Sequence, residues 1–304
     1  APARSSPLLR RVAQATNRTV RACRKLVAQG QVLVDGQRCC DTLLMVAPES
    51  PVVVVMRDET PGVRGAVAHI EAPPPNDHYL KLCKPRGVVC SHRRAGPRPR
   101  PVVRQLYPSG VEDVLHMVGR LDGDSEGLLL LTSDGTFTRF LCEKEVRLEK
   151  EYVALVHCPD GAPPQEELMR RLCEGVDIAD GQATAVAAEV VDFDGRFARM
   201  RIVVTEGRFH MVRRMVRAIG YRCLQLFRTH VGGISGAELG PRSLQAAARE
   251  AWHPEPPLIA PAVRGDPRSL RPGEYADVSP EEVAHVYRLG LGWLDAKVPV
   301  AGRR

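Results

Sequence analysis

The segment VGRLDGDSEGLLLLTSDG, residues 118–135, decides the fold class, because it leads from an acidic, glycine-rich loop into an apolar strand. Glycine lets a chain turn tightly, and four consecutive leucines are typical of a buried strand. The turn Ser133-Asp134-Gly135 then ends that strand. A carboxylate on such a loop, where a strand begins, can serve as a nucleophile or a base.

Three other interpretations of this loop compete with catalysis. Asp122, Asp124, Glu126 and Gly127 fit the first, third, fifth and sixth positions of a calcium-binding loop. That interpretation fails, because the twelfth position is Ser133, where a bidentate glutamate is required. A glycosidase-type acid pair needs a set separation across a sugar, which neighbouring acids on one loop do not establish. A solvated acidic turn stays open as the third alternative.

The segment EGRFHMVRRMVRAIG, residues 206–220, is predicted to form an amphipathic basic helix. Its apolar residues share one helical face, its arginines point elsewhere, and Gly220 supplies a C-terminal stop. These arginines either form a charged outer face or bind phosphates and pair with a carboxylate.

The surrounding elements follow one another in irregular order. Residues 152–157 and 201–205 have the apolar pattern of strands, whereas residues 165–172 and 211–219 have helical spacing. Mixed elements in this order favour an α+β fold over a doubly wound parallel sheet.

The first 56 residues are predicted to form a small separate domain. Apolar spacing over 8–12 and over 20–27 predicts two helices, with a cap between them at 17–19. Residues 31–34 alternate as a strand does and lead into Asp35-Gly36, which is a strong hairpin signal.

A further strand is predicted at 51–56, before a stretch of different composition. Residues 57–77 mix charge, glycine and a proline triplet, and are expected to form an interdomain linker.

Positive charge gathers in three stretches of the 304-residue chain, which has a net charge of +7. Residues 1–34 hold seven basic residues and no acid, and residues 201–228 hold seven arginines and one acid. The third stretch, again without acids, contains Arg93, Arg94, Arg98, Arg100 and Arg104. Clustered arginine is the pattern expected of nucleic-acid binding, although solvated basic faces remain an alternative.

The nine cysteines are scattered and show neither a CxxC pair nor zinc-ligand spacing. They indicate a reducing compartment, packing roles and no structural metal. No apolar run is long enough to cross a membrane, so no membrane partner is expected. The arginine-rich start and the high Ala, Arg and Pro content lead us to expect a mitochondrial or other organellar protein, and a cytoplasmic one otherwise.

Five segments in order resemble the RsuA/RluB-type pseudouridine synthases of ribosomal RNA. They are LKLCKPRGVVCS (80–91), GRLDGDSEGLLLLTSDG (119–135), EKEYVALV (149–156), EGRFHMVRRMVRAIGY (206–221) and LFRTHVGGIS (226–235). The resemblance implies a mixed, largely antiparallel sheet with flanking helices and a central RNA cleft, over residues 78–290. It also places a surface insertion at about 242–268 and a C-terminal tail at 291–304.

The N-terminal segment LVAQGQVLVDGQ, residues 26–37, resembles the core of a small RNA-binding domain shared with a ribosomal small-subunit protein (S-four-like). This resemblance implies that the basic helices of residues 1–56 lie on RNA phosphates. Arg21, Arg24 and Lys25 are the residues expected to do so.

The family resemblance implies an isomerase that flips a uridine out of ribosomal RNA and rejoins its base to the ribose through carbon. Asp122 would act as nucleophile or as base, Arg213 would pair with Asp122, and Tyr152 would pack against the uracil. Arg120 would fill the gap left by the flipped nucleotide. The other residues expected to bind RNA are Lys84, Arg86, Arg208, His210, Arg214 and Arg217.

The same resemblance implies no cofactor and no metal, and a role in ribosome biogenesis on a pre-ribosomal particle. Ribosomal proteins or assembly factors are possible partners of the 242–268 insertion. Ser125 and Met211 replace the family's usual Thr and Gln. These changes and the insertion leave a second interpretation, an RNA-binding ribosome assembly factor with weak or no catalysis.

Overall fold

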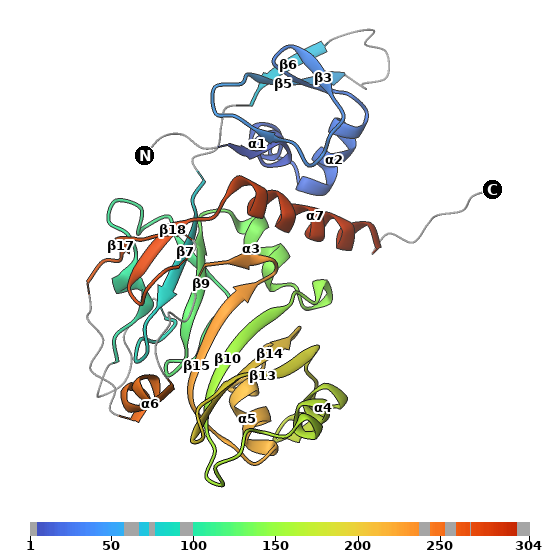
Figure 1. Cartoon of the computed structure of the whole chain (residues 1–304). Coiled ribbons are helices and arrows are strands. Elements are labelled where there is room, and N and C mark those ends of the chain that lie inside the picture. The colour runs from blue at the N-terminus through green and yellow to red at the C-terminus, as the bar shows by residue number, and fades with distance from the viewer. Residues whose placement is uncertain are drawn as a thin grey trace, which may run out of the picture. The chain divides into compact units, whose positions relative to one another are not determined.

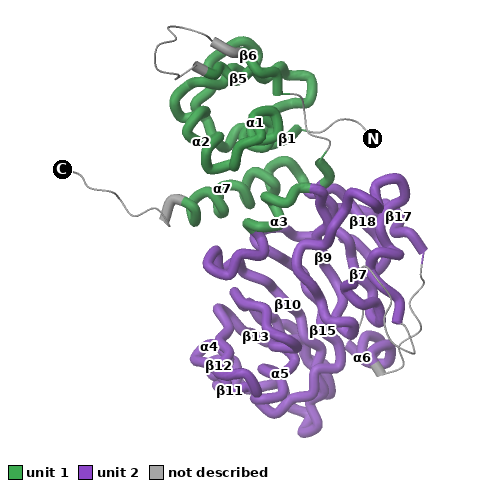
Figure 2. The backbone as a smooth tube through the Cα atoms, turned by 180° about the vertical axis from the view of Figure 1, so that it is seen from behind, with its two compact units in different colours: residues 1–78, 134–140, 279–304 green, residues 79–133, 141–278 purple. Residues whose placement is uncertain are grey.

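The computed structural model describes residues 5–57, 67–72, 77–91, 100–236, 244–252, 260–267 and 269–296. The chain divides into two compact units (Figure 2). Unit 1 comprises residues 1–78, 134–140 and 279–304, and unit 2 comprises residues 79–133 and 141–278.

Unit 1 begins with the two predicted helices, α1 (Leu8–Thr16) and α2 (Val20–Ala28). Both bury an apolar face, and the hydroxyl of Thr19 caps α2 by accepting from the backbone N–H of Ala22 at 3.3 Å. The predicted hairpin is also confirmed: β2 (Val32–Val34) pairs with β3 (Gln37–Cys39). Its turn has positive φ at Asp35 and Gly36, as a two-residue hairpin turn requires.

A four-stranded antiparallel sheet, in the order β3-β2-β5-β6, completes this part of unit 1. β5 (Val52–Arg57) confirms the strand predicted there. β6 (Val67–Glu71) pairs with β5, so the prediction of a linker over 57–77 is wrong for these residues. Residues 58–66 and 73–76 of that predicted linker lie outside the described residues. A second pair joins β1 (Ser6–Pro7) to β4 (Met45–Val46).

The remainder of unit 1 comes from distant parts of the sequence: the start of α3 (Gly135–Cys142) and the long helix α7 (Pro280–Ala296). The fully buried carboxylate of Asp134 accepts a hydrogen bond from the Tyr287 hydroxyl at 2.5 Å. Arg10 of α1 lies 3.5 Å from the same carboxylate. α7 continues to residue 296, so the prediction of a tail from 291 is wrong for its first six residues.

Unit 2 is built on a ten-stranded mixed sheet, in the main order β13-β14-β10-β15-β9-β7-β18-β17 (Figure 1). Two pairs, β15–β9 and β17–β18, are parallel and the others are antiparallel, which confirms the largely antiparallel α+β class. The strands are β7 (Tyr79–Lys84), β8 (His116–Val118), β9 (Glu126–Thr132), β10 (Lys150–His157), β13 (Ala187–Phe193), β14 (Phe197–Val204), β15 (Arg222–Val231), β16 (Ile234–Ser235), β17 (Val263–Arg264) and β18 (Glu274–Asp277).

Helices cover both faces of this sheet. α4 (Glu166–Glu174) and α5 (Met211–Ala218) pack in the main core against alternate residues of β10 and β14. Beside them lie the hairpin of β11 (Val176–Ile178) and β12 (Gly181–Ala183). Two short 3-10 helices, Val103–Leu106 and Lys144–Val146, complete the unit.

The helix α6 (Leu244–Trp252) packs in a separate cluster with Leu155, Phe197 and Leu224, on the strand positions that alternate with the main core. The expectation that residues 242–268 form only a surface insertion is therefore wrong for α6. Its alanine-rich face is buried and completes the fold.

No described helix is long and apolar enough to cross a membrane. All nine cysteines are free thiols, and the predicted packing role applies to the buried Cys23, Cys83 and Cys158.

Candidate active site

Asp122 lies on the loop between β8 and β9, as the sequence predicted. The backbone N–H of Ser125 donates to the Asp122 carbonyl at 3.1 Å, and the N–H of Leu121 donates to Cys90 Sγ at 3.2 Å. Leu121 is buried, whereas 27% of the Asp122 side chain is exposed. Buried Leu121 thus fixes the loop, while the neighbouring Asp122 carboxylate reaches the surface.

The glycine that ends this loop is required by close packing. Gly127 has φ of +100°, and a Cβ at this position would lie 2.3 Å from the backbone oxygen of Arg228. No side chain fits between β9 and its parallel neighbour β15 at this point.

The side chain beside the Asp122 carboxylate is that of His210, which precedes α5. His210 Nε2 lies 3.7 Å from Asp122 Oδ1. The backbone of His210 is left-handed, with φ of +51°, and this turn aims its ring back at the loop. The structure therefore brings together two residues, 88 apart in sequence, that the sequence had assigned to different roles.

Arg213 does not pair with Asp122 among the contacts of the described residues, so that prediction is wrong. Its guanidinium donates to the backbone oxygen of Asp124 at 2.6 Å and to that of Cys223 at 3.3 Å. A guanidinium is a rigid fork that suits two carbonyls held apart. Arg213 therefore ties the catalytic loop to β15 and does not contact the carboxylate.

Tyr152 occupies β10, opposite Ile202 of β14 and Arg228 of β15. Its side chain is 8% exposed and belongs to the main core. The same core contains Met211, which stands where the resembled family has Gln, so this position contributes packing and no polar group.

Arg228 is a site residue that sequence reasoning missed. It is 4% exposed, and it donates from Nε to the Leu128 oxygen at 2.9 Å and from a terminal nitrogen to the Arg120 oxygen at 3.4 Å. These two carbonyls stand on either side of Asp122. The available signal was an arginine within the apolar strand LQLFRTHV, where a buried charge needs a structural or functional reason.

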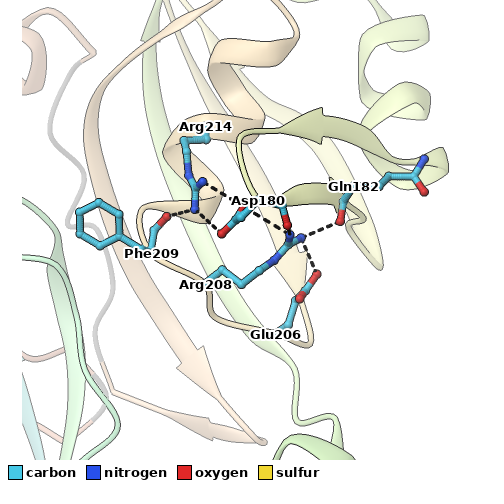
Figure 3. A network of polar contacts seen from close by, with 6 residues as sticks. All are labelled: Asp180, Gln182, Glu206, Arg208, Phe209 and Arg214. Atoms are coloured by element: carbon cyan, nitrogen blue, oxygen red, sulfur yellow. Dashed lines mark hydrogen bonds and ion pairs between the residues drawn. The ribbon is translucent and has the colours of Figure 1, made fainter.

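Two of the arginines predicted to bind RNA are instead held by protein groups (Figure 3). Asp180, in the β11–β12 turn, accepts from both terminal nitrogens of Arg214 at 2.9 and 3.0 Å. Arg208 donates to the carbonyl oxygens of Asp180 and Gln182 and pairs with Glu206. The hydrogen bond from Arg214 holds the pKa of Asp180 below its ordinary value, so the carboxylate stays charged. The prediction that Arg208 and Arg214 are free to bind phosphates is wrong.

Lys84 is also unavailable to RNA. Its side chain is fully buried, and its ammonium group donates to the Pro85 and Val88 oxygens at 2.9 Å each. Burial lowers its pKa to about 8. Its predicted role in RNA binding is therefore wrong, because β7 is covered on both faces. Half-buried Arg86 is occupied in part, since it donates to the Ala251 oxygen of α6 at 2.8 Å.

Other predicted RNA-binding cations do face solvent. Arg120 and Arg217 are exposed and have no ion-pair partner among the described residues, and the same holds for Arg21 and Lys25 of α2. Arg24 is partly exposed on the same helix. These positions agree with a role in phosphate binding.

The second basic stretch is only partly visible. Arg93, Arg94 and Arg98 lie outside the described residues. Arg100 pairs with Asp124 at 2.9 Å, and Arg104 pairs with Asp113 at 2.7 Å.

The site thus offers a partly exposed carboxylate, an imidazole beside it and a loop fixed by backbone contacts from Arg213 and Arg228. Such a carboxylate can act as a nucleophile or as a general base. Nowhere in the described stretches are three or more His, Cys, Asp or Glu side chains grouped to hold a metal ion.

Comparisons with known proteins place the chain beside one family. A family model described as RNA pseudouridylate synthase matches residues 78–218, which include Asp122, Tyr152, His210 and Arg213. A protein of Mycobacterium leprae named as an uncharacterized RNA pseudouridine synthase is 35% identical over 232 residues, which are 76% of this chain and 84% of the relative.

Two other relatives carry more specific names. Ribosomal large subunit pseudouridine synthase B of Bacillus subtilis is 32% identical, over 68% of this chain and 78% of its own. Ribosomal small subunit pseudouridine synthase A of Yersinia pestis is 28% identical, over 68% of this chain and 72% of its own. A crystal structure of a pseudouridylate synthase matches with a TM-score of 0.51 and 21% identity, over 92% of this chain and 98% of the other, and this likeness concerns the fold.

Proposed function

The chain belongs to the RNA pseudouridylate synthase family, and we propose that it converts a uridine of ribosomal RNA to pseudouridine. The observation that carries this proposal is the placement of Asp122. It stands partly exposed on the glycine loop of the matched segment, beside His210 and between two carbonyls held by Arg228. The named ribosomal RNA enzymes among the relatives support the class of substrate.

The reaction is an isomerisation that breaks the C1′–N1 bond of uridine and forms a C1′–C5 bond. The C5 hydrogen leaves as a proton, and N1 gains one, so that atoms and charge balance. A uracil inside a helix is out of reach of Asp122, so the nucleotide must be extruded at a cost of about a few kcal/mol. Exposed Arg120, two residues before Asp122, would fill the gap.

Two routes remain for Asp122: attack on the sugar or base, and removal of a ribose proton. Both routes use the carboxylate in its ionised form, and His210 Nε2 lies 3.7 Å from it. Tyr152 would contact the uracil from the core side, and Arg213 would act through the loop. Its contacts are to backbone oxygens, so Arg213 is a positioning residue.

Phosphate contacts would come from the cations that face solvent. We propose that α2, within an S-four-like RNA-binding domain, supplies part of them through Arg21, Arg24 and Lys25. Such contacts position an RNA and carry little sequence information. The proposed setting is a pre-ribosomal particle, where folded ribosomal RNA is accessible.

The deciding experiment maps pseudouridine across ribosomal RNA in cells that carry the natural protein or Asp122→Asn. The variant keeps the size of the side chain and removes its charge, so we expect complete loss of pseudouridine at the target uridine. Asp124→Asn is the matched control, because that side chain is exposed and forms only a surface ion pair with Arg100. The control should leave the map unchanged.

An unchanged map in Asp122→Asn cells would contradict the proposal. If ribosome assembly still depended on the protein in that case, the chain would act as an RNA-binding assembly factor on a synthase fold. In vitro, release of the C5 hydrogen as tritium from labelled ribosomal RNA provides an independent measurement of the reaction.

A further inference from the structure

Phe209 is an exposed aromatic residue to which the proposed reaction gives no role. Its side chain is 73% exposed, more than any other large apolar side chain that the structure describes. Exposure alone carries no meaning, because single apolar residues are common on protein surfaces. The position of this ring and its contact with His210 distinguish it from the others.

The ring of Phe209 extends a stack that starts at the catalytic loop. It lies on the imidazole of His210, with ring centroids 3.9 Å apart and an angle of 16° between the planes. The same imidazole lies 3.7 Å from the Asp122 carboxylate. A flat face is therefore presented to solvent one imidazole away from the reacting group.

Hydrogen bonds within the protein hold the backbone that carries this ring. Arg214 donates to the carbonyl of Phe209 while Asp180 holds the guanidinium of Arg214. In Figure 3 the Phe209 ring points away from this network of Asp180, Arg208 and Arg214. These bonds hold the backbone of Phe209, and its ring rests on the imidazole of His210, so that less conformational freedom is lost when a ligand stacks on it.

Two exposed cations, on the helix that follows Phe209 and on the loop of Asp122, indicate the kind of ligand. Both are arginines that are exposed and have no ion-pair partner in the described part of the chain. Arg217 lies three residues after Arg214 on α5, and Arg120 lies two residues before Asp122. An aromatic face accompanied by arginines suits single-stranded nucleic acid, where bases stack on rings and phosphates bind cations.

We propose that Phe209 is a stacking platform for an unpaired RNA base that neighbours the target uridine. The inference rests on the proposed function and deepens it. It gives the enzyme a requirement for substrate structure: a base beside the target must be free to leave its helix. Uridines flanked by stably paired bases would be poor substrates.

The test is a double-mutant cycle with the full-length chain carrying Asp122→Asn, which prevents turnover during binding. The probe is a fragment of ribosomal RNA around the uridine found by the mapping experiment. Dissociation constants are measured for Phe209 and Phe209→Leu, on the intact fragment and on fragments with an abasic site at each flanking position. Phe209→Leu should weaken binding of the intact fragment by about 5- to 100-fold, the effect of one base–aromatic stack.

The decisive result is whether the effect of Phe209→Leu on affinity depends on the presence of the stacked base. Phe209→Leu should have no effect on the fragment that lacks the stacked base, and Phe209→Trp should bind the intact fragment as the natural residue does. Val191→Ala, another exposed apolar position, on β13, is the matched control and should not change affinity. An equal loss on every fragment, or no loss on any, would overturn the inference.

The two proposals fail in distinguishable ways. Absence of any Asp122-dependent pseudouridine would defeat the proposed function itself. A mapped target whose binding is insensitive to Phe209→Leu would leave the function standing and remove only the stacking role.

Discussion

Helices α2 and α5 each carry three basic residues, but the two sets are placed differently. Arg21 and Lys25 of α2 are exposed and form no ion pair within the described ranges. In α5, Arg213 donates to two backbone oxygens and Arg214 is held by Asp180, whereas Arg217 remains exposed.

The difference follows from the groups that surround each helix. Residues 1–34 contain no acid, and the charges of Arg21 and Lys25 stay available to a polyanion. α5 instead packs beside the β11–β12 turn, which supplies Asp180, and beside β15, which supplies a backbone oxygen at Cys223. Counting arginines therefore overestimates phosphate contacts at α5, where two of the three arginines organise the active site.

Among the variants that distinguish α5 from α2, Arg213→Ala is expected to have the largest effect on turnover. Without its two hydrogen bonds the loop that carries Asp122 loses its tie to β15, and the turnover number should fall about 100-fold at saturating RNA. Arg217→Ala, on the same helix but exposed, should raise KM and leave turnover unchanged. Tritium release followed over a range of RNA concentrations gives both the turnover number and KM; equal effects of the two variants would show that α5 acts as one phosphate-binding surface.

A smaller effect on turnover is expected for Asp180→Asn. This variant removes the acid that pairs with α5, so that α5, like α2, would have no acidic partner there. Loss of the carboxylate charge removes the ion pair of Arg214 and loosens the loop at His210, so turnover should fall about tenfold. The released Arg214 should steepen the dependence of log Kd on log salt by about one unit. Filter binding over a series of salt concentrations measures this slope, and an unchanged slope would contradict the idea that Asp180 keeps Arg214 from phosphates.

The smallest effect on turnover is expected for Arg21→Ala combined with Lys25→Ala. Both side chains are exposed, so the salt slope should become shallower by about two units, affinity should weaken, and turnover at saturating RNA should not change. The matched control is Arg170→Ala on α4, an exposed arginine already paired with Glu167 and Glu174. If the control lowered the slope as much as the double variant, the assignment of phosphate binding to α2 would be wrong.

Elements whose structure depends on residues close in sequence were predicted from the sequence. The helices of residues 8–28, the hairpin at Asp35-Gly36 and the loop of Asp122 were predicted because caps, turn residues and apolar spacing act over a few residues. β6 was missed because its strand character comes from pairing with β5, across a segment of linker-like composition.

Within the site, residue types were predictable and their partners were not. The sequence placed Asp122 and Arg213 near each other but could not show that the guanidinium would reach backbone oxygens. Lys84 was expected to bind RNA because its segment, residues 80–91, resembles that of the family, yet β7 is buried over its whole length. Side-chain direction in both cases depends on neighbours that are distant in sequence.

The bond between Asp134 and Tyr287 has a consequence for the biosynthesis of the protein. The two residues are 153 positions apart, and a ribosome that adds about 5–20 residues per second needs roughly 8 to 30 s to travel that distance. During this interval the nascent chain holds an aspartate whose hydrogen-bond partner on α7 has not yet been made. Unit 1 can therefore close only after α7 has been synthesised, and chains that end before α7 would expose its unfinished core to the quality-control machinery of the cell.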